Sequence, residues 1–168
     1  MPETSKRTET ETGKRKQEAR AEEAAPEEAT TTAAEEPLDE RVLTSLHAAA
    51  DKKATGLLVL DLRAVASFTD FFVIASGTNV RQVQAVADEV VERVRKEHKQ
   101  KPARVEGYQT GEWVLLDYGD FIVHVFEEKA RRFYDLERLW RDGARVALPG
   151  ELAASAAPAP GGSLRSEG

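Results

Sequence analysis

Two stretches of the chain carry hydrophobic residues at every third or fourth position, a spacing that predicts amphipathic helices. The first stretch is 39–54, with Asp39 as its cap and Gly56 ending it. The second is 80–98, where Asn79 and Gln82 have the form of a capping box. The apolar positions are Leu38, Val42, Leu43, Leu46 and Ala50 in the first helix, and Val83, Val86, Ala87, Val90 and Val94 in the second.

Shorter apolar runs without that spacing predict strands. Residues 57–62 form a nearly continuous apolar run, which is typical of a strand buried on both faces at the centre of a sheet. Residues 71–76 form a second strand, and 104–108 are a candidate for an additional one. Residues 112–126 contain two apolar runs around a four-residue turn at 117–120, which predicts a β-hairpin.

A last helix is predicted over 127–143, with Phe133, Leu136 and Trp140 as its buried stripe. The resulting order of helices and strands predicts an α/β fold in which a mixed β-sheet is flanked by helices.

The two ends of the chain lack the composition of a core. Residues 1–37 are rich in charged residues, Thr and Ala, and they predict a disordered charged extension. Residues 149–168 have the composition of a flexible Ala/Pro/Gly tail. The folded domain is therefore expected at 38–148.

Charge and cysteine content exclude several classes of function. The formal net charge is −6, but the predicted domain holds 17 basic and 18 acidic residues, without the positive excess of a domain that grips nucleic acid. The absence of cysteine excludes disulfides, thiol catalysis and cysteine-ligated zinc. There is no apolar run of membrane-spanning length, and the acidic extension favours a cytoplasmic protein over a mitochondrial one.

Strand alternation divides the hairpin into two faces. If Tyr118 and Gly119 form a two-residue turn, Trp113 pairs with His124. One face then holds Trp113, Leu115, Ile122, His124 and Phe126, and the other holds Val114, Leu116, Phe121, Val123 and Val125. The first face, with Asp117 and Asp120 beside it at the turn, has the composition of an exposed contact patch with a tryptophan anchor. Alternatively, Trp113 covers the edge of a core and His124 is a structural histidine.

An enzyme is the weaker interpretation. Asp61, Asp70, Asp117, Asp120 and His124 could be assembled into a metal or acid–base site, but no spacing among them supports it. We therefore predict no catalytic residue, no metal and no cofactor. The arginines of the last helix predict a solvated face with local ion pairs, and some of these arginines could touch RNA: Arg131, Arg132, Arg138 and Arg141.

Several blocks together resemble the ribosomal silencing factor family, also called Iojap-like. They are DKKA at 51–54, VLDLR at 59–63, TDFFVIASGT at 69–78, RQVQAVADEV at 81–90, VEGY at 105–108, GEWVLLDYGDFIVHVF at 111–126 and RRFYDLERLW at 131–140. The resemblance implies a topology similar to nucleotidyltransferases without their catalytic residues. It also implies a cytosolic protein, a homodimer when free, that binds the fourteenth protein of the large ribosomal subunit, blocks joining of the small subunit and represses translation in nutrient limitation. A large-subunit maturation factor is an alternative with the same binding site.

The resemblance also carries residue roles. Trp113 matches a tryptophan that resembles a partner-contact anchor. Asp117, Tyr118, Gly119 and Asp120 match the family's turn, whose acids would meet basic side chains on a ribosomal protein. His124 matches the histidine of the following strand. Arg132, Tyr134 and Glu137 match the last block, where contact, fold and dimer roles all stay open.

Overall fold

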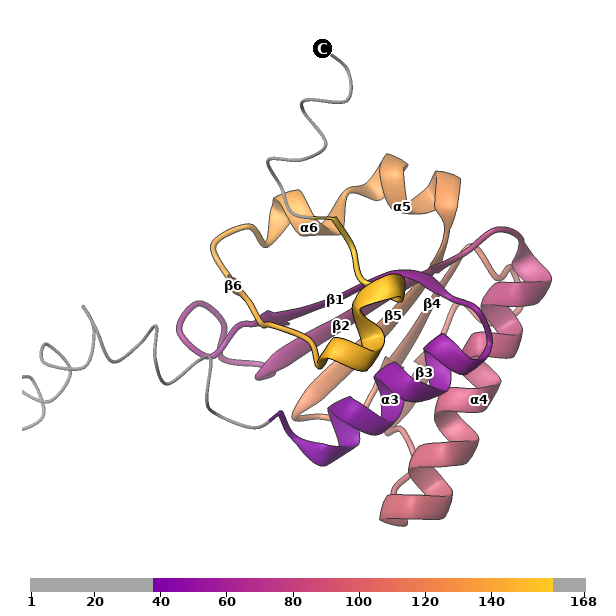
Figure 1. Ribbon diagram of the computed structural model, residues 1–168, viewed down its shortest axis with the longest axis horizontal. Coiled ribbons are helices and arrows are strands. Elements are labelled where there is room, and N and C mark those ends of the chain that lie inside the picture. The colour runs from indigo at the N-terminus through magenta and orange to yellow at the C-terminus, as the bar shows by residue number, and fades with distance from the viewer. Residues whose placement is uncertain (1–37, 159–168) are drawn as a thin grey trace, which may run out of the picture. The chain divides into compact units, whose positions relative to one another are not determined.

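A computed structural model describes residues 38–158, which form one mixed β-sheet with helices on both faces (Figure 1). The strands are β1 (Thr55–Asp61), β2 (Phe71–Gly77), β3 (Arg104–Glu106), β4 (Trp113–Asp117), β5 (Phe121–Glu127) and β6 (Ala144–Arg145). Their order across the sheet is β3-β4-β5-β2-β1-β6; β2 and β5 are parallel, and the other pairs are antiparallel. The helices are α3 (Glu40–Asp51), α4 (Val80–His98), α5 (Glu128–Tyr134), α6 (Leu136–Leu139) and the 3-10 helix η2 (Gly150–Ser155). The predicted α/β class is confirmed.

The first two helices begin at the caps that the sequence predicts. The Asp39 carboxylate accepts a hydrogen bond from the backbone N–H of Arg41, which starts α3. The Asn79 side chain accepts from the N–H of Gln82 at 2.8 Å and starts α4. Gln82 in turn accepts from the N–H of Thr78, one residue before the cap, so the capping box is closed one position early.

Two separate cores lie on the two faces of the sheet. In Figure 1, α3 and α4 lie on one side of the strands, and α5 and α6 lie on the other. The first core joins the stripes of α3 and α4, Leu152 of η2 and one hairpin face. The second core joins the opposite hairpin face to Ala130 of α5 and Leu136 of α6. Both cores depend on strands whose side chains alternate between faces.

The hairpin confirms the predicted faces but corrects the register. Trp113 pairs with Phe126 and Leu115 pairs with His124, a shift of two residues from the predicted pairing. The Tyr118 N–H donates to the Phe121 carbonyl, so the turn consists of Gly119 and Asp120. Gly119 has a φ of +90°, which glycine adopts without a Cβ penalty. Because the shift is an even number, each side chain stays on its predicted face.

Two further expectations about the first half of the domain need correction. β1 is buried on both faces as predicted, but it lies next to the two-residue edge strand β6, and the centre of the sheet is β5 and β2. Helix α3 ends at Asp51, and Gly56 lies within β1, where the register with β2 shifts. Gly56 therefore forms part of a bulge in the strand and does not end the helix.

The last helix is broken in two, which the sequence did not predict. Asp135 has a φ of +51° and separates α5 from α6. Leu136 is buried as expected, and Trp140 packs against Phe72 with ring centroids 5.6 Å apart. Phe133, however, is 79 % exposed, because the break turns the first helix relative to the second and takes Phe133 off the buried stripe.

The folded unit extends past residue 148, the predicted end of the domain. Leu152 of η2 is buried in the first core, and the Ala157 N–H donates to the Leu57 carbonyl at 2.8 Å. The buried side chain of Leu152 and a backbone hydrogen bond to β1 thus hold in place a segment whose composition predicts a flexible tail. The predictions for 1–37 and for 159–168 lie outside the described residues. Among the helices that the structure describes, no candidate for a membrane span is found.

Candidate partner-binding surface

Trp113 begins β4 and is half-buried, with its indole ring held by three side chains. Its Nε1–H donates to Nδ1 of His124 at 3.1 Å. The ring stacks on Phe126 at a centroid distance of 4.9 Å and lies 4.9 Å from the ring of Tyr134 on α5. The tryptophan is therefore fixed between β5 and α5, with part of its surface accessible.

His124 supports this tryptophan from inside the second core. It is 3 % exposed, and its ring packs against the ring of Phe72 edge to face, with centroids 4.4 Å apart. Because Nδ1 accepts the indole proton, we assign the imidazole proton to Nε2, which has no hydrogen-bond partner among the described residues. Burial lowers the pKa of His124 to about 3, so the ring is neutral near pH 7. His124 has the structural position that the sequence left open as the alternative.

The two acids of the hairpin turn are engaged within the domain. Asp117 accepts from the N–H of Gly119 at 2.9 Å and pairs with Arg104 at 3.3 Å. Asp120 pairs with Arg41 at 3.1 Å, which ties the turn to the start of α3. Both carboxylates therefore stabilise the local structure, and Asp120 remains 65 % exposed on its side chain.

Tyr118 is buried and is not on the surface of the turn. It is 4 % exposed and stacks on Phe121 with centroids 4.7 Å apart and an interplanar angle of 9°. Its hydroxyl has no hydrogen-bond partner among the described residues, and burial raises its pKa to about 12. Gly119 is exposed at the tip of the turn.

The six residues predicted for partner binding do not form one surface. Trp113 and His124 lie together, whereas the turn lies at the other end of β4, about 13 Å away by the rise of four strand residues. Within the first group, only Trp113 is accessible.

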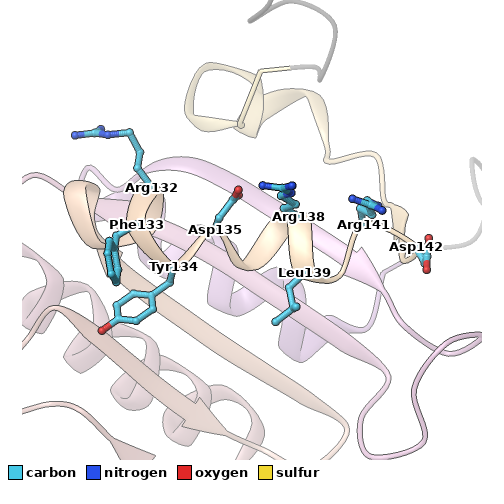
Figure 2. A pocket seen from close by; sticks show the side chains of 8 residues that line it. All are labelled: Arg132, Phe133, Tyr134, Asp135, Arg138, Leu139, Arg141 and Asp142. Atoms are coloured by element: carbon cyan, nitrogen blue, oxygen red, sulfur yellow. The ribbon is translucent and has the colours of Figure 1, made fainter.

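Beside Trp113, the helical segment α5–α6 carries exposed apolar side chains that sequence reasoning missed. Phe133 and Leu139 are 79 % and 74 % exposed, and Tyr134, which touches Trp113, is 48 % exposed. Figure 2 shows these three side chains on one side of the segment, which we call the apolar side. Large exposed hydrophobic residues gathered in this way mark an interaction surface.

The break at Asp135 explains why the apolar side was missed. A continuous helix over 127–143 would place Phe133 and Leu136 on one stripe, whereas the left-handed Asp135 separates them. A signal was present, because Asp is one of the few residues other than Gly that adopt this conformation. Tyr134 was also among the residues that the resemblance singled out.

The opposite side of the segment carries arginines: Arg132, Arg138 and Arg141, which we call the arginine side (Figure 2). None of these three forms an ion pair in the part of the chain that the structure describes. Arg131 differs, because it pairs with Glu137 at 2.8 Å and donates to the Ser76 hydroxyl. The predicted local ion pairs are thus found for Arg131 alone among the four arginines.

The carboxylates considered for a metal or acid–base site are dispersed. Asp61 pairs with Arg63 at 2.7 Å, and Asp117 and Asp120 have the separate arginine partners described above. Within residues 38–158, no group of three His, Asp or Glu side chains is placed to hold a metal ion.

Comparison with known proteins gives one consistent result. Residues 34–163 match the family model described as "Ribosomal silencing factor during starvation". The chain is 40 % identical over 108 residues to ribosomal silencing factor RsfS of Halalkalibacterium halodurans, covering 64 % of this chain and 92 % of the relative. It is 36 % identical over 107 residues to RsfS of Bacillus subtilis, covering 62 % and 90 %. A mouse relative, 29 % identical over 91 residues, is named mitochondrial assembly of ribosomal large subunit protein 1; 53 % of this chain and 40 % of that protein are covered.

Solved structures agree with the fold. A crystal structure of protein CV0518 from Chromobacterium violaceum matches with a TM-score of 0.59 at 33 % identity, covering 66 % of this chain and 88 % of that one. A crystal structure from Bacillus halodurans matches with a TM-score of 0.57 at 38 % identity, covering 65 % and 98 %.

Proposed function

This chain belongs to the ribosomal silencing factor family, and from that membership we propose that it binds the large ribosomal subunit at its intersubunit face and sterically blocks joining of the small subunit. Relatives named ribosomal silencing factor support a ribosome-associated silencing role. The family description includes starvation, which supports repression of translation when nutrients are limiting. The protein would act in the cytoplasm, where ribosomes assemble on messages.

The observation that carries this proposal is the apolar side beside Trp113. Phe133, Tyr134 and Leu139 are exposed around a tryptophan whose orientation is fixed by His124. Aromatic residues held rigidly before binding lose little conformational entropy, and they dominate the energy of many interfaces. The partner we propose for this surface is the fourteenth protein of the large subunit, with Asp120 and Asp117 of the turn as peripheral contacts to basic side chains.

Such a factor needs no catalytic step. A protein bound to a surface that the small subunit must also occupy reduces association by mass action, and the effect follows its concentration and affinity. We therefore propose a binding protein and not a nucleotidyltransferase-like enzyme. A thermal shift of the protein with nucleoside triphosphate and a divalent cation, lost in Asp117→Asn, would favour the enzyme instead.

We also propose that the free protein is a homodimer. Leaving Phe133 and Leu139 in water is unfavourable, and a second copy would bury apolar area until the ribosome replaces it. Sedimentation equilibrium of the purified protein, alone and as the Phe133→Ala/Leu139→Ala variant, tests this. A monomer at all concentrations would contradict it.

The experiment for the main proposal is sucrose-gradient sedimentation with isolated large and small subunits. We expect the protein only with large subunits, fewer reassociated ribosomes, and loss of both effects in Phe133→Ala/Leu139→Ala. These side chains are exposed, so their truncation leaves the fold intact. Val105→Ala is the matched control, because Val105 is an exposed apolar residue on the distant edge strand β3. Binding to neither subunit, or full binding by the double variant, would contradict the proposal.

A role in maturation of the large subunit is the second candidate, and the name of the mouse relative favours it. Both roles use the same binding surface. They differ in timing, because a maturation factor acts during rapid growth and a silencing factor acts in starvation. Accumulation of precursor large subunits in a growing deletion strain would favour maturation, whereas excess assembled ribosomes in a starved one would favour silencing.

A further inference from the structure

A cleft of about 1040 Å³ lies between β1, the arginine side of α5–α6 and residues 157–158. Its apolar lining includes Leu58 and Leu60 of β1 and Ala157. Five arginines line it: Arg131, Arg132, Arg138, Arg141 and Arg145. None of Trp113, the 117–120 turn and His124 lines this cleft, but four of its arginines are those of the last helix for which the sequence left contact with RNA open.

The cleft is positively charged within an acidic protein. Its lining contains five arginines against the three acids Glu128, Asp135 and Glu137, a surplus of +2, whereas the whole chain has a net charge of −6. Two of the arginines are engaged: Arg131 pairs with Glu137, and Arg145 donates to the carbonyls of Ala157 and Pro158. The other three, on the arginine side, keep their guanidinium donors for another molecule.

We propose that this cleft binds the phosphate backbone of an RNA strand. The proposal rests on the proposed function, because a ribosome presents folded RNA beside its surface proteins. Guanidinium groups bind phosphate oxygens through paired N–H donors, and a row of them along one segment matches a polyanion better than a single anion.

The apolar lining is consistent with RNA and less so with a simple anion. An unpaired nucleotide has an apolar base face as well as a charged phosphate, and proteins that read RNA commonly stack such bases on arginine planes or against apolar side chains. Leu58 and Leu60 are each 4 % exposed and form only the floor of the cleft, so a base would stack mainly on an arginine plane such as that of Arg132, while Arg138 and Arg141 contact the phosphates.

The position of the cleft allows it to act together with the protein contact. In the view of Figure 2 the arginine side and the apolar side point away from each other, although both border one open pocket of about 660 Å³, whereas the cleft is lined by the arginines and by none of Phe133, Tyr134 and Leu139. A partner protein on the apolar side would leave the cleft open. One short segment would thus contact a protein and RNA at once, which would raise the affinity of the complex above that of either contact alone.

The test is fluorescence anisotropy with a labelled, short single-stranded RNA of mixed sequence. With three phosphate contacts, log K should change with log salt with a slope of about −2, so raising salt from about 50 to about 200 mM weakens binding about 20-fold. Arg138→Ala/Arg141→Ala should bind at least about tenfold more weakly at low salt and with a shallower slope. Arg81→Ala/Arg95→Ala removes the same charge from exposed positions on α4, across the sheet, and should bind like the parent.

The outcomes separate this inference from the proposed function. The proposal that the cleft binds RNA is overturned if Arg138→Ala/Arg141→Ala binds RNA as tightly as the parent, or if the parent binds no RNA at low salt. Displacement of RNA by ATP at equal concentration overturns it in favour of a nucleotide site. If the parent still sediments with large subunits in any of these cases, the proposed function stands while the RNA inference falls. RNA binding without sedimentation supports the cleft and contradicts the proposed function.

Discussion

The indole N–H of Trp113 donates to Nδ1 of His124 across 3.1 Å, so a buried ring fixes the orientation of an accessible one. His124 lies on β5 and Trp113 on the adjacent strand β4, and both face the second core. The accessible tryptophan of the proposed binding surface therefore depends on an acceptor that no partner would touch. Protonation of His124 would remove this acceptor.

This pair predicts a dependence of stability on pH. The pKa of His124 is about 3 in the folded protein and about 6.5 when unfolded, so below pH 6.5 the unfolded chain binds a proton that the folded chain does not. The contribution of neutral His124 is complete above pH 6.5 and is lost as the pH falls toward 3. Urea denaturation should show a loss of about 2 kcal/mol between pH 7 and pH 5 from this group.

Two variants isolate that contribution. His124→Leu removes the titrating ring, so its free energy of unfolding should vary less with pH over this range. Trp113→Phe removes the hydrogen bond but leaves the histidine buried, and it should keep the pH dependence. Parallel curves for the parent and His124→Leu would show that another group is responsible.

A second prediction concerns the buried hydroxyl of Tyr118. The hydroxyl has no partner within the described residues, whereas the ring stacks on Phe121. Tyr118→Phe removes only the hydroxyl, and we expect stability to be unchanged or to rise by about 1 kcal/mol. Tyr118→Ala empties the site and should cost about 3–5 kcal/mol. A clear loss of stability in Tyr118→Phe, measured by thermal denaturation, would mean that the hydroxyl has a partner in solution.

A third prediction compares two glycines with positive φ. Gly119 has a φ of +90° and no atom within 4 Å of an added Cβ, so Gly119→Ala should cost only about 1–2 kcal/mol of backbone strain. Gly107 has a φ of +79°, and an added Cβ would collide with the carbonyl oxygen of Trp113. Gly107→Ala should therefore cost more than about 3 kcal/mol and displace the start of β4. Similar costs in urea denaturation would contradict this ranking.

A fourth prediction concerns the ion pair that joins α5 to α6. The Arg131 side chain is 11 % exposed, and Glu137 is its acidic partner at 2.8 Å. Glu137→Gln leaves a largely buried guanidinium without a compensating charge, and we expect a loss of about 1–3 kcal/mol, given that Glu137 is itself 33 % exposed. Glu92→Gln breaks the exposed pair with Arg95 and serves as the control, with no measurable change expected. An equal loss of stability in the two variants would show that the burial of Arg131 does not make its ion pair more important than an exposed one.

The sequence predicted most of the fold because its signals are local. The spacing of valines in α4 and the alternation in the hairpin determine which side faces a core, and those assignments are confirmed. The prediction of the hairpin register was wrong because the register depends on whether Gly119 is the first or the second residue of the turn, and composition leaves this open. The break at Asp135 was missed for a similar reason, since one residue with positive φ leaves the surrounding pattern helical.

The site was harder to predict than the fold. Trp113 is accessible, as a partner contact requires, whereas His124 and Tyr118 are buried. Their burial could not be predicted, because a polar atom in a sequence gives no indication of how far it lies from solvent. The exposure of Phe133 and Leu139 follows from the geometry of two short helices. The cleft arises between β1 and residues nearly a hundred positions later, and no local pattern brings such segments together.

The alternation of side chains between the two cores along the hairpin has a consequence for evolution. Insertions or deletions of two residues in the loop after Asp117 would preserve the inward and outward assignment of every later position in β5. A slip of one residue in the pairing of β4 with β5 would exchange the environments of Phe121 and Ile122, and with them the two cores. Homologous chains should therefore keep the pairing of β4 with β5 and accommodate any change of length within the loop itself or in a bulge.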